Sequence, residues 1–306
     1  MSTMPLFSGS IPENYERSLG PFIFEPYAVD LAARVGADPG RRSDAGGQSG
    51  EGGQSGAGAS LGAGARSGQG VRSDAGGLSR VLETACGTGR VTAHLRSSLP
   101  EGVQLIATDL NPDMIATAKK IVPLAGIHWQ VADAQALPFA DNYFDVLVSQ
   151  FGLMFMPDKP RALAEAHRVL APGGRLLLST WDSLENNPAF FLANQLVQRH
   201  FPIDPPRFFY LPFSMYDKSM LLALVTDAGF TSIRIELVKK EGRSASAADA
   251  VTGMLEGSPM HSAINERDPA LMPVLKKELA AGLAARFGNA PMVSQMQAWV
   301  VEGVKS

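Results

Sequence analysis

The chain of 306 residues contains a single cysteine, Cys86. One thiol cannot form an internal disulfide, and it cannot supply the cluster of thiolates that structural zinc needs. The sequence also lacks an excess of basic residues, because 27 Lys and Arg stand against 30 Asp and Glu, for a net charge of −3. This balance argues against broad electrostatic capture of nucleic acid or of an acidic membrane.

Long hydrophobic runs are missing as well. No stretch of about 18 apolar residues occurs, so no transmembrane helix is expected. The first seven residues have neither a basic start nor an apolar core, which argues against a signal peptide, and the lone cysteine fits a reducing cytoplasm. The pattern Gly-x-x-x-x-Gly-Lys-Ser/Thr is also absent, which excludes the usual ATP- or GTP-binding loop.

The most informative segment is 81–90, Val-Leu-Glu-Thr-Ala-Cys-Gly-Thr-Gly-Arg. An apolar run, a Gly-x-Gly pair and an amphipathic continuation predict a strand, a tight turn and a helix. The glycines let the backbone approach a ligand closely, and a helix start offers unpaired N–H groups. Asp109 ends the next apolar run, where a carboxylate can accept hydrogen bonds from both hydroxyls of a ribose. We therefore expect a cofactor that contains adenosine.

Strand-like and helix-like patterns alternate after this segment, which predicts an α/β fold. We expect a Rossmann-like, doubly wound, mostly parallel sheet of seven strands, with helical additions that cover its ligand edge. The expected strands are 80–85, 103–109, 126–131, 144–149, 175–181, 231–238 and 296–302. The expected helices are 26–35, 89–98, 112–121, 160–170, 187–200, 217–228, 246–256 and 269–287.

One segment does not look globular. Residues 38–78 hold 14 of the 31 glycines and few large aliphatic side chains, so they cannot bury enough apolar surface to offset their ordering entropy. We interpret this segment as a flexible insertion, either a passive surface loop or one with a regulatory or binding role. The predicted organisation is an N-terminal cap and first helix (1–37), the insertion (38–78), a cofactor-binding core (79–182), and covering helices with the last strands of the same sheet (183–306).

The glycine pattern alone leaves the cofactor open. A dinucleotide fold usually has a third glycine or alanine three residues past the second, and Thr92 stands there instead. A nicotinamide-dependent oxidoreductase is therefore the weaker reading, although it stays an alternative.

Five ordered motifs between residues 79 and 182 help to distinguish the possible cofactors. They are Glu83-x-x-Cys-Gly-Thr-Gly-Arg90, Thr108-Asp-Leu-Asn-Pro-Asp-Met114, Ala132-Asp-Ala-Gln-Ala-Leu-Pro-Phe139, Phe144-Asp145 and Arg168-Val-Leu-Ala-Pro-Gly-Gly174. In this order and spacing they resemble the class I S-adenosylmethionine-dependent methyltransferases, in particular the group that includes ubiquinone and menaquinone biosynthesis enzymes. The resemblance implies S-adenosylmethionine as cofactor and methyl transfer as activity.

The resemblance also implies roles for single residues. The turn at 87–89 would hold the methionine part of the cofactor, and Glu83 would order this loop or meet the amino group through water. Asp109 would bind the ribose hydroxyls. Asp133 and the Ala134 N–H would bind the adenine, and Gln150 would lie beside the methionine end of the cofactor. The complete predicted cofactor-binding set is Tyr15, Glu83, Ala85, Gly87, Gly89, Arg90, Asp109, Leu110, Met114, Asp133, Ala134 and Gln150. In it Leu110 and Met114 flank the adenine, and Tyr15 folds over the cofactor.

The methyl acceptor is less clear. Enzymes that methylate the planar amines of nucleobases or protein amides often carry Asn/Asp-Pro-Pro-Tyr/Phe after the fourth strand. This chain has Ser149-Gln-Phe-Gly152 there. A nucleic-acid substrate is therefore not expected. A covering segment rich in Phe, Met and Pro predicts an apolar pocket for a small hydrophobic or aromatic metabolite, although plain helix packing explains it equally well. The residues expected to wall this pocket are Phe190, Phe191, Phe208, Phe209, Phe213, Met215 and Met220.

No catalytic residue and no metal site are assigned from the sequence. Methyl transfer from a sulfonium needs alignment more than acid–base help, so the sequence does not have to reveal a base. His200 and His261 lie in the covering region and are the only histidines we would test. A non-catalytic protein that binds S-adenosylmethionine or a metabolite stays an alternative, and the oligomeric state is not predicted.

Overall fold

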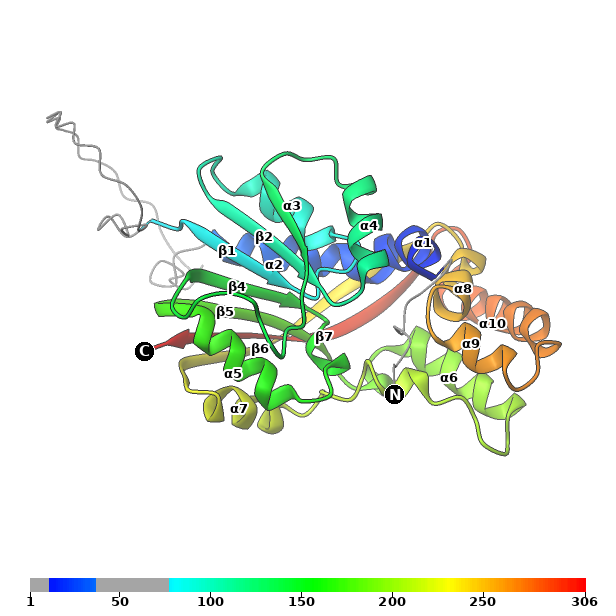
Figure 1. Cartoon of the computed structure of the whole chain (residues 1–306). Coiled ribbons are helices and arrows are strands. Elements are labelled where there is room, and N and C mark those ends of the chain that lie inside the picture. Colours follow the sequence, from blue (N-terminus) through cyan, green and yellow to red (C-terminus); the bar gives the residue numbers. More distant parts are fainter. Residues whose placement is uncertain (1–10, 37–76) are drawn as a thin grey trace, which may run out of the picture.

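The computed structural model describes residues 11–36 and 77–306 (Figure 1). The strands are β1 (Arg80–Thr84), β2 (Gln104–Asp109), β3 (Ile127–Val131), β4 (Phe144–Gln150), β5 (Leu170–Trp181), β6 (Phe230–Ser244) and β7 (Met292–Lys305). The helices are α1 (Ile11–Asn14), η1 (Tyr15–Phe24), α2 (Glu25–Val35), α3 (Arg90–Ser98), α4 (Pro112–Ile121), η2 (Leu153–Phe155), α5 (Lys159–Val169), η3 (Leu184–Asn186), α6 (Pro188–His200), η4 (Phe208–Tyr210), α7 (Lys218–Asp227), α8 (Ala247–Glu256), α9 (Met260–Asn265) and α10 (Leu271–Phe287).

The strands form one sheet of seven in the order β3-β2-β1-β4-β5-β7-β6. Among the described strands, β7 pairs antiparallel with both β5 and β6, and all the other pairings are parallel. The predicted fold class is therefore confirmed. The chain leaves β1 toward β2 and β3, then returns to the other side of β1 at β4. This reversal opens a crevice at the carboxyl ends of β1 and β4, the usual ligand position in such sheets.

Helices cover both faces of the sheet. On one face α2 packs against α3, and α3 and α4 make the crossovers from β1 to β2 and from β2 to β3. On the other face α5 contacts β5, and α7 contacts both α5 and β6 (Figure 1). Because crossovers between parallel strands are right-handed, helices of connections that run toward one edge of the sheet lie on one face, and helices of connections toward the other edge lie on the opposite face.

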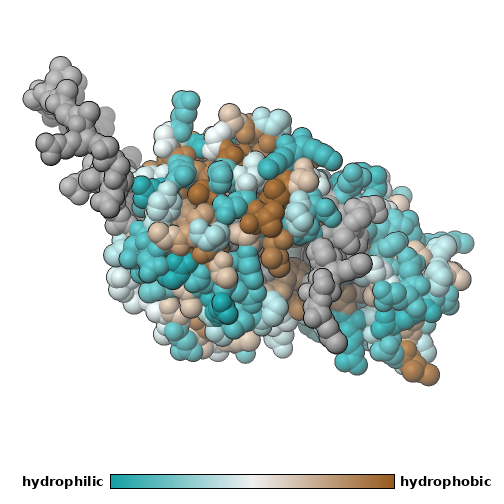
Figure 2. Space-filling view, viewed as in Figure 1, coloured by the Kyte–Doolittle hydropathy of each residue, from teal (hydrophilic) through white to brown (hydrophobic). Residues whose placement is uncertain are grey.

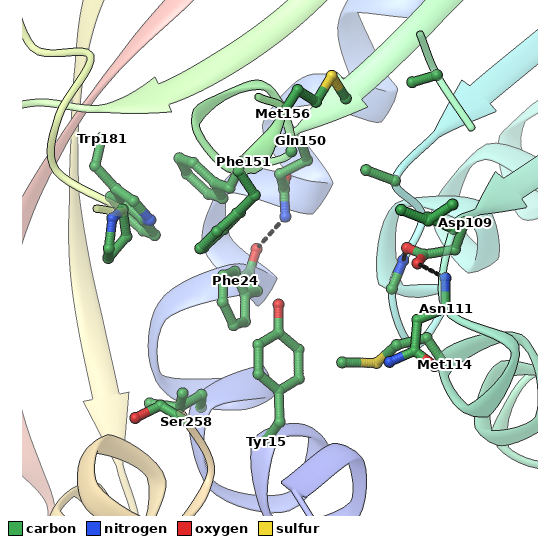
Figure 3. Close-up of a pocket in the computed structure, with 18 of the residues that line it drawn as sticks. Tyr15, Phe24, Asp109, Asn111, Met114, Gln150, Phe151, Met156, Trp181 and Ser258 are labelled. Carbon is green, nitrogen blue, oxygen red and sulfur yellow. Dashed lines mark hydrogen bonds between the residues drawn. The ribbon is translucent and has the colours of Figure 1, made fainter. Parts of the chain in front are cut away.

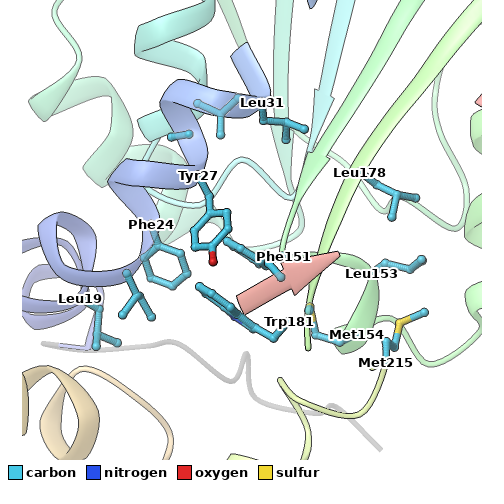
Figure 4. Close-up of a cluster of buried hydrophobic side chains, with 14 of the residues drawn as sticks. Leu19, Phe24, Tyr27, Leu31, Phe151, Leu153, Met154, Leu178, Trp181 and Met215 are labelled. Atoms are coloured by element: carbon cyan, nitrogen blue, oxygen red, sulfur yellow. The ribbon is translucent and has the colours of Figure 1, made fainter. Parts of the chain in front are cut away.

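Four aromatic side chains anchor α2 and the end of η1 to the sheet (Figure 4). Phe151 and Trp181 stack with ring centroids 3.7 Å apart and planes 5° apart. Tyr27 meets both rings edge-on, at 5.4 and 5.3 Å, and its buried hydroxyl donates a hydrogen bond to the carbonyl of Val238. Phe24 packs against Phe151 and Trp181 at 6.0 and 6.3 Å. These contacts bring the N-terminal helices to the carboxyl end of the sheet.

The helices α6, α8, α9 and α10 lie beyond the carboxyl ends of the parallel strands (Figure 1). They pack on one another, since α10 contacts α6, α8 and α9, and α8 contacts η1. The surface that these helices present in Figure 2 is mostly hydrophilic. None of the helices in residues 11–36 and 77–306 is long and apolar enough to cross a membrane.

Several elements differ from the expected bounds. β6 and β7 form a longer antiparallel ribbon than predicted, paired from Phe230 with Lys305 to Ser244 with Met292. β5 begins at Leu170, which pairs with Phe144, rather than after the glycines at 173 and 174. The helical residues 11–24 and α9 were not predicted. Of the predicted insertion 38–78, only residues 77 and 78 fall within the described part of the chain.

Candidate functional site

A cavity of about 260 Å³ lies at the carboxyl ends of the parallel strands (Figure 3). Its lining comes from η1, from the loops after β1 to β5, and from the covering segments. One end is polar and includes Asp109, Asn111, Asp133 and Gln135. The other end is walled by aromatic and aliphatic side chains: Leu19, Ile23, Phe24, Phe151, Phe155, Met156, Trp181, Phe190, Phe208, Phe209, Pro212 and Phe213.

The turn after β1 depends on left-handed backbone conformations. Ala85, Gly87 and Gly89 have φ values of 52°, 56° and 84°. Glycine adopts this region without steric cost, whereas Ala85 is held there by its surroundings. A Cβ at Gly89 would lie 2.8 Å from the Trp129 ring, so this glycine also lets the start of α3 pack against β3.

Asp109 holds this turn and the next one together. One carboxylate oxygen accepts a hydrogen bond from the Gly87 N–H (2.8 Å), and the other accepts from the Asn111 N–H (2.9 Å). Asn111 in turn caps α4 by accepting from the Asp113 N–H at 2.8 Å. Burial raises the pKa of Asp109, and the hydrogen bonds from backbone N–H groups partly oppose that effect. The carboxylate therefore has a fixed orientation at the wall of the cavity.

The loop after β3 presents a donor and an acceptor side by side. The Asp133 carboxylate accepts from the Gln135 N–H at 2.8 Å. Within the described part of the chain, the Ala134 N–H donates no hydrogen bond, although Ala134 lines the cavity. Leu110 is 65% exposed and Met114 is buried, and both line the same end. This corner thus combines two apolar side chains with one donor and one acceptor.

Tyr15 and Gln150 stand between the two ends of the cavity. The Tyr15 ring stacks on Phe24 with centroids 4.7 Å apart, and its hydroxyl points into the cavity (Figure 3). Burial raises the pKa of Tyr15 above its ordinary value, and the nearby Glu16 and Asp109 raise it further. Gln150 donates from Nε2 to the Phe24 carbonyl at 3.3 Å, which links the end of β4 to η1.

Nine of the twelve predicted cofactor-binding residues line this one cavity. They are Tyr15, Ala85, Gly87, Asp109, Leu110, Met114, Asp133, Ala134 and Gln150. Glu83, Gly89 and Arg90 do not line it. Glu83 is buried beneath the turn, where burial raises its pKa to about 8 and Thr92 donates to its carboxylate at 2.6 Å. The Arg90 side chain turns toward the N-terminal helices.

The apolar end was predicted only in part. Phe190, Phe208, Phe209 and Phe213 of the covering segment line the cavity, but its Phe191, Met215 and Met220 do not. Apart from Tyr15, the contributions of η1 were not predicted, and neither were Trp181 at the end of β5 and the residues that follow β4. The spacing of Tyr15, Leu19 and Ile23, which repeats every four residues, was the available signal of a helix face.

The two histidines selected from the sequence lie outside the cavity lining. His200 pairs with Glu278 at 2.9 Å, and His261 contacts the Asn265 amide at 3.0 Å. At the apolar end, Ser258 is the only hydroxyl side chain among the described residues, and it donates to the Met254 carbonyl at 2.6 Å. In the described residues no group of three or more His, Cys, Asp or Glu could hold a metal ion.

Comparison with known proteins identifies the central part of the chain. Residues 82–178 match the family model described as "Methyltransferase domain". The ubiquinone/menaquinone biosynthesis C-methyltransferase UbiE of Dinoroseobacter shibae is 40% identical over 111 residues, which are 35% of this chain and 44% of that protein. UbiE of Pectobacterium atrosepticum is 41% identical over 103 residues, 32% of this chain and 41% of that protein. The chain thus matches less than half the length of these relatives.

The YcgJ protein of Bacillus subtilis gives a structural match with a TM-score of 0.47 and 20% identity, over 74% of this chain and 92% of that one. The sequence match falls on the strands and turns that build the polar end of the cavity. Residues 82–178 are therefore similar to the methyltransferase domain family and to part of the UbiE C-methyltransferases.

Proposed function

We propose that the chain binds S-adenosylmethionine at the polar end of the cavity and transfers its methyl group to a small apolar or aromatic acceptor at the other end. One observation carries this proposal: a single cavity joins the turn at Gly87 and the Asp109 carboxylate to a wall of aromatic side chains. A cofactor site and an acceptor site in one enclosed space are what direct group transfer requires.

The polar end fits the adenosine part of this cofactor. The Asp109 carboxylate is already oriented by two backbone N–H groups and keeps acceptor capacity for ribose hydroxyls. Asp133 can accept from the adenine amino group, while the Ala134 N–H is free to donate to a ring nitrogen. Leu110 and Met114 supply apolar surface for the two faces of the base.

The turn after β1 and the residues facing it fit the methionine part. The Gly87 backbone borders the cavity, and a Cβ built there would meet no other atom within 4 Å, so the turn leaves open space for a ligand. Gln150 and Tyr15 lie between Asp109, which holds this turn, and the aromatic wall (Figure 3). When bound, S-adenosylmethionine supplies a methyl group that is already activated by its sulfonium. The chain would then mainly orient the acceptor and exclude water.

The apolar end favours an acceptor with little polarity. Its wall contains no charged side chain in the described residues, and the Ser258 hydroxyl is engaged with the Met254 carbonyl. Phe151 and Trp181 present stacked rings to the cavity, a surface that favours planar or hydrocarbon ligands.

A methyl-transfer screen tests the proposal. The full chain is incubated with S-adenosylmethionine and with quinol, polyketide, phenolic, amine and sugar acceptors, and methylated products are sought by mass spectrometry. We expect turnover on hydrophobic or aromatic acceptors. Turnover confined to the sugars or other highly polar acceptors would contradict the assignment of the apolar end. Binding of S-adenosylmethionine without transfer to any acceptor would instead favour a non-catalytic binding protein.

A further inference from the structure

Arg90 joins the cofactor turn to the N-terminal helix although it does not line the cavity. Its guanidinium forms ion pairs with Glu16, near the start of η1, and with Glu25, directly after the end of η1 (2.7 Å). It also donates to the main-chain carbonyl of Glu16 at 3.3 Å. The Arg90 guanidinium therefore lies alongside η1 and is paired with a carboxylate near each end of this helix.

Two further contacts strengthen this arrangement. The Thr88 hydroxyl, at the centre of the Gly-Thr-Gly turn, donates to Glu16 at 2.5 Å, and Thr88 is only 2% exposed. A Cβ at Gly20 would overlap the Arg90 guanidinium, so glycine at this position lets the arginine lie directly against η1. The side chains of Arg90 and Glu16 are 19% and 20% exposed, which limits screening of their ion pair by solvent.

The helix held in this way forms part of the cavity wall. Tyr15, Leu19, Ile23 and Phe24 of η1 line both the boundary near Asp109 and the apolar end. η1 is a π-helix, a form often associated with functional sites. The position of the wall therefore depends on the same contacts that fix the turn.

We propose that Glu16, Gly20, Thr88 and Arg90 form a staple that positions the cofactor turn and η1 against each other, so that cofactor affinity depends on residues that never touch the cofactor. This inference rests on the proposed function, because it concerns the binding of S-adenosylmethionine. Arg90 thus becomes a positioning residue rather than a cofactor contact.

Gly20→Ala is the sharpest test. The added methyl group displaces the Arg90 guanidinium, while alanine favours a helix more than glycine does, so the folded chain is not weakened through helix propensity. We expect titration calorimetry to give about tenfold weaker binding of S-adenosylhomocysteine. Hydrogen–deuterium exchange of the amides at 15–24 should become faster. The matched control is Gly36→Ala, where a Cβ meets nothing within 4 Å, and its affinity should stay within about twofold of the original.

A second set of variants tests the same staple from the other side. Glu16→Gln and Thr88→Val each remove one of its bonds, and both should weaken binding, whereas Glu13→Gln, at an exposed position in the preceding turn, should not. Failure of the original chain to bind S-adenosylmethionine or S-adenosylhomocysteine would refute the proposed function. Normal binding by the original chain, with unchanged affinity and unchanged exchange in Gly20→Ala and Glu16→Gln, would refute the staple alone.

Discussion

Asp109 is the side chain on which the cofactor turn and the start of α4 converge, because its carboxylate accepts from the N–H groups of Gly87 and Asn111. Asp109→Ala leaves both donors without this partner and removes the proposed acceptor of the ribose hydroxyls. We expect binding of S-adenosylhomocysteine, measured by titration calorimetry, to weaken by about 1–3 kcal/mol. Asp113→Ala, at an exposed position in the first turn of α4, is the control. Unchanged affinity in a folded Asp109→Ala chain would contradict the ribose role.

Glu83 makes the stability of the chain depend on pH. Its pKa rises from an ordinary 4.5 to about 8 on folding, chiefly through burial. Between pH 4.5 and about pH 8 the Glu83 carboxyl is protonated in the folded state and ionised in the unfolded state. Its contribution to the free energy of unfolding is therefore complete below about pH 4.5 and is lost as the pH rises through about 8.

Glu83→Gln tests this dependence, since the amide cannot ionise and can still accept from Thr92. Urea unfolding between about pH 5 and about pH 8 should show a smaller loss of stability for this variant than for the original chain. Glu101→Gln, at an exposed position, should retain the original pH dependence. Parallel curves for the original chain and Glu83→Gln would show that burial does not perturb the carboxyl.

At the scale of elements, local pattern predicted the central strands and helices closely. β1 to β4 and α3 to α5 agree with the expected bounds within two residues. The ends of β6 and β7 were not predictable in this way, because the run 239–243 is largely charged and takes its strand form from pairing with β7. The direction of Arg90 was equally hidden, since its partner Glu16 lies 74 residues earlier in the sequence.

The contact of α2 with the last two strands depends on Arg34. This arginine is buried and pairs with Asp30 of its own helix, with Glu236 of β6 (3.1 Å) and with Glu302 of β7 (2.9 Å). Arg34→Met removes the cation that these three carboxylates share, while Lys240 still pairs with Asp30 (3.2 Å) and Arg234 with Glu236 (3.3 Å). We expect the free energy of unfolding, measured in urea, to fall by about 2–3 kcal/mol, less than for a fully buried pair because the acids are partly exposed.

Arg199→Met, at an exposed position on α6, serves as the control and should change stability by no more than about 0.5 kcal/mol. A similarly small change in Arg34→Met would mean that the cluster does not hold α2 to the sheet.

At the scale of the whole molecule, the two ends of the cavity come from different parts of the chain. The family match, residues 82–178, supplies the turn and the polar loops. The apolar end draws mainly on η1 and on residues after 178, including Trp181, Phe190 and Phe209. This division explains why the motifs predict a cofactor but leave the acceptor open: the residues that would select the acceptor lie largely outside the matched segment.

We expect this cavity to select S-adenosylmethionine over a dinucleotide. Titration calorimetry of the full chain with S-adenosylmethionine, S-adenosylhomocysteine and NAD tests it most directly. We expect saturable binding of the first two compounds, strongly weakened by Asp109→Ala, and no binding of NAD. Binding of NAD without binding of S-adenosylmethionine would contradict it.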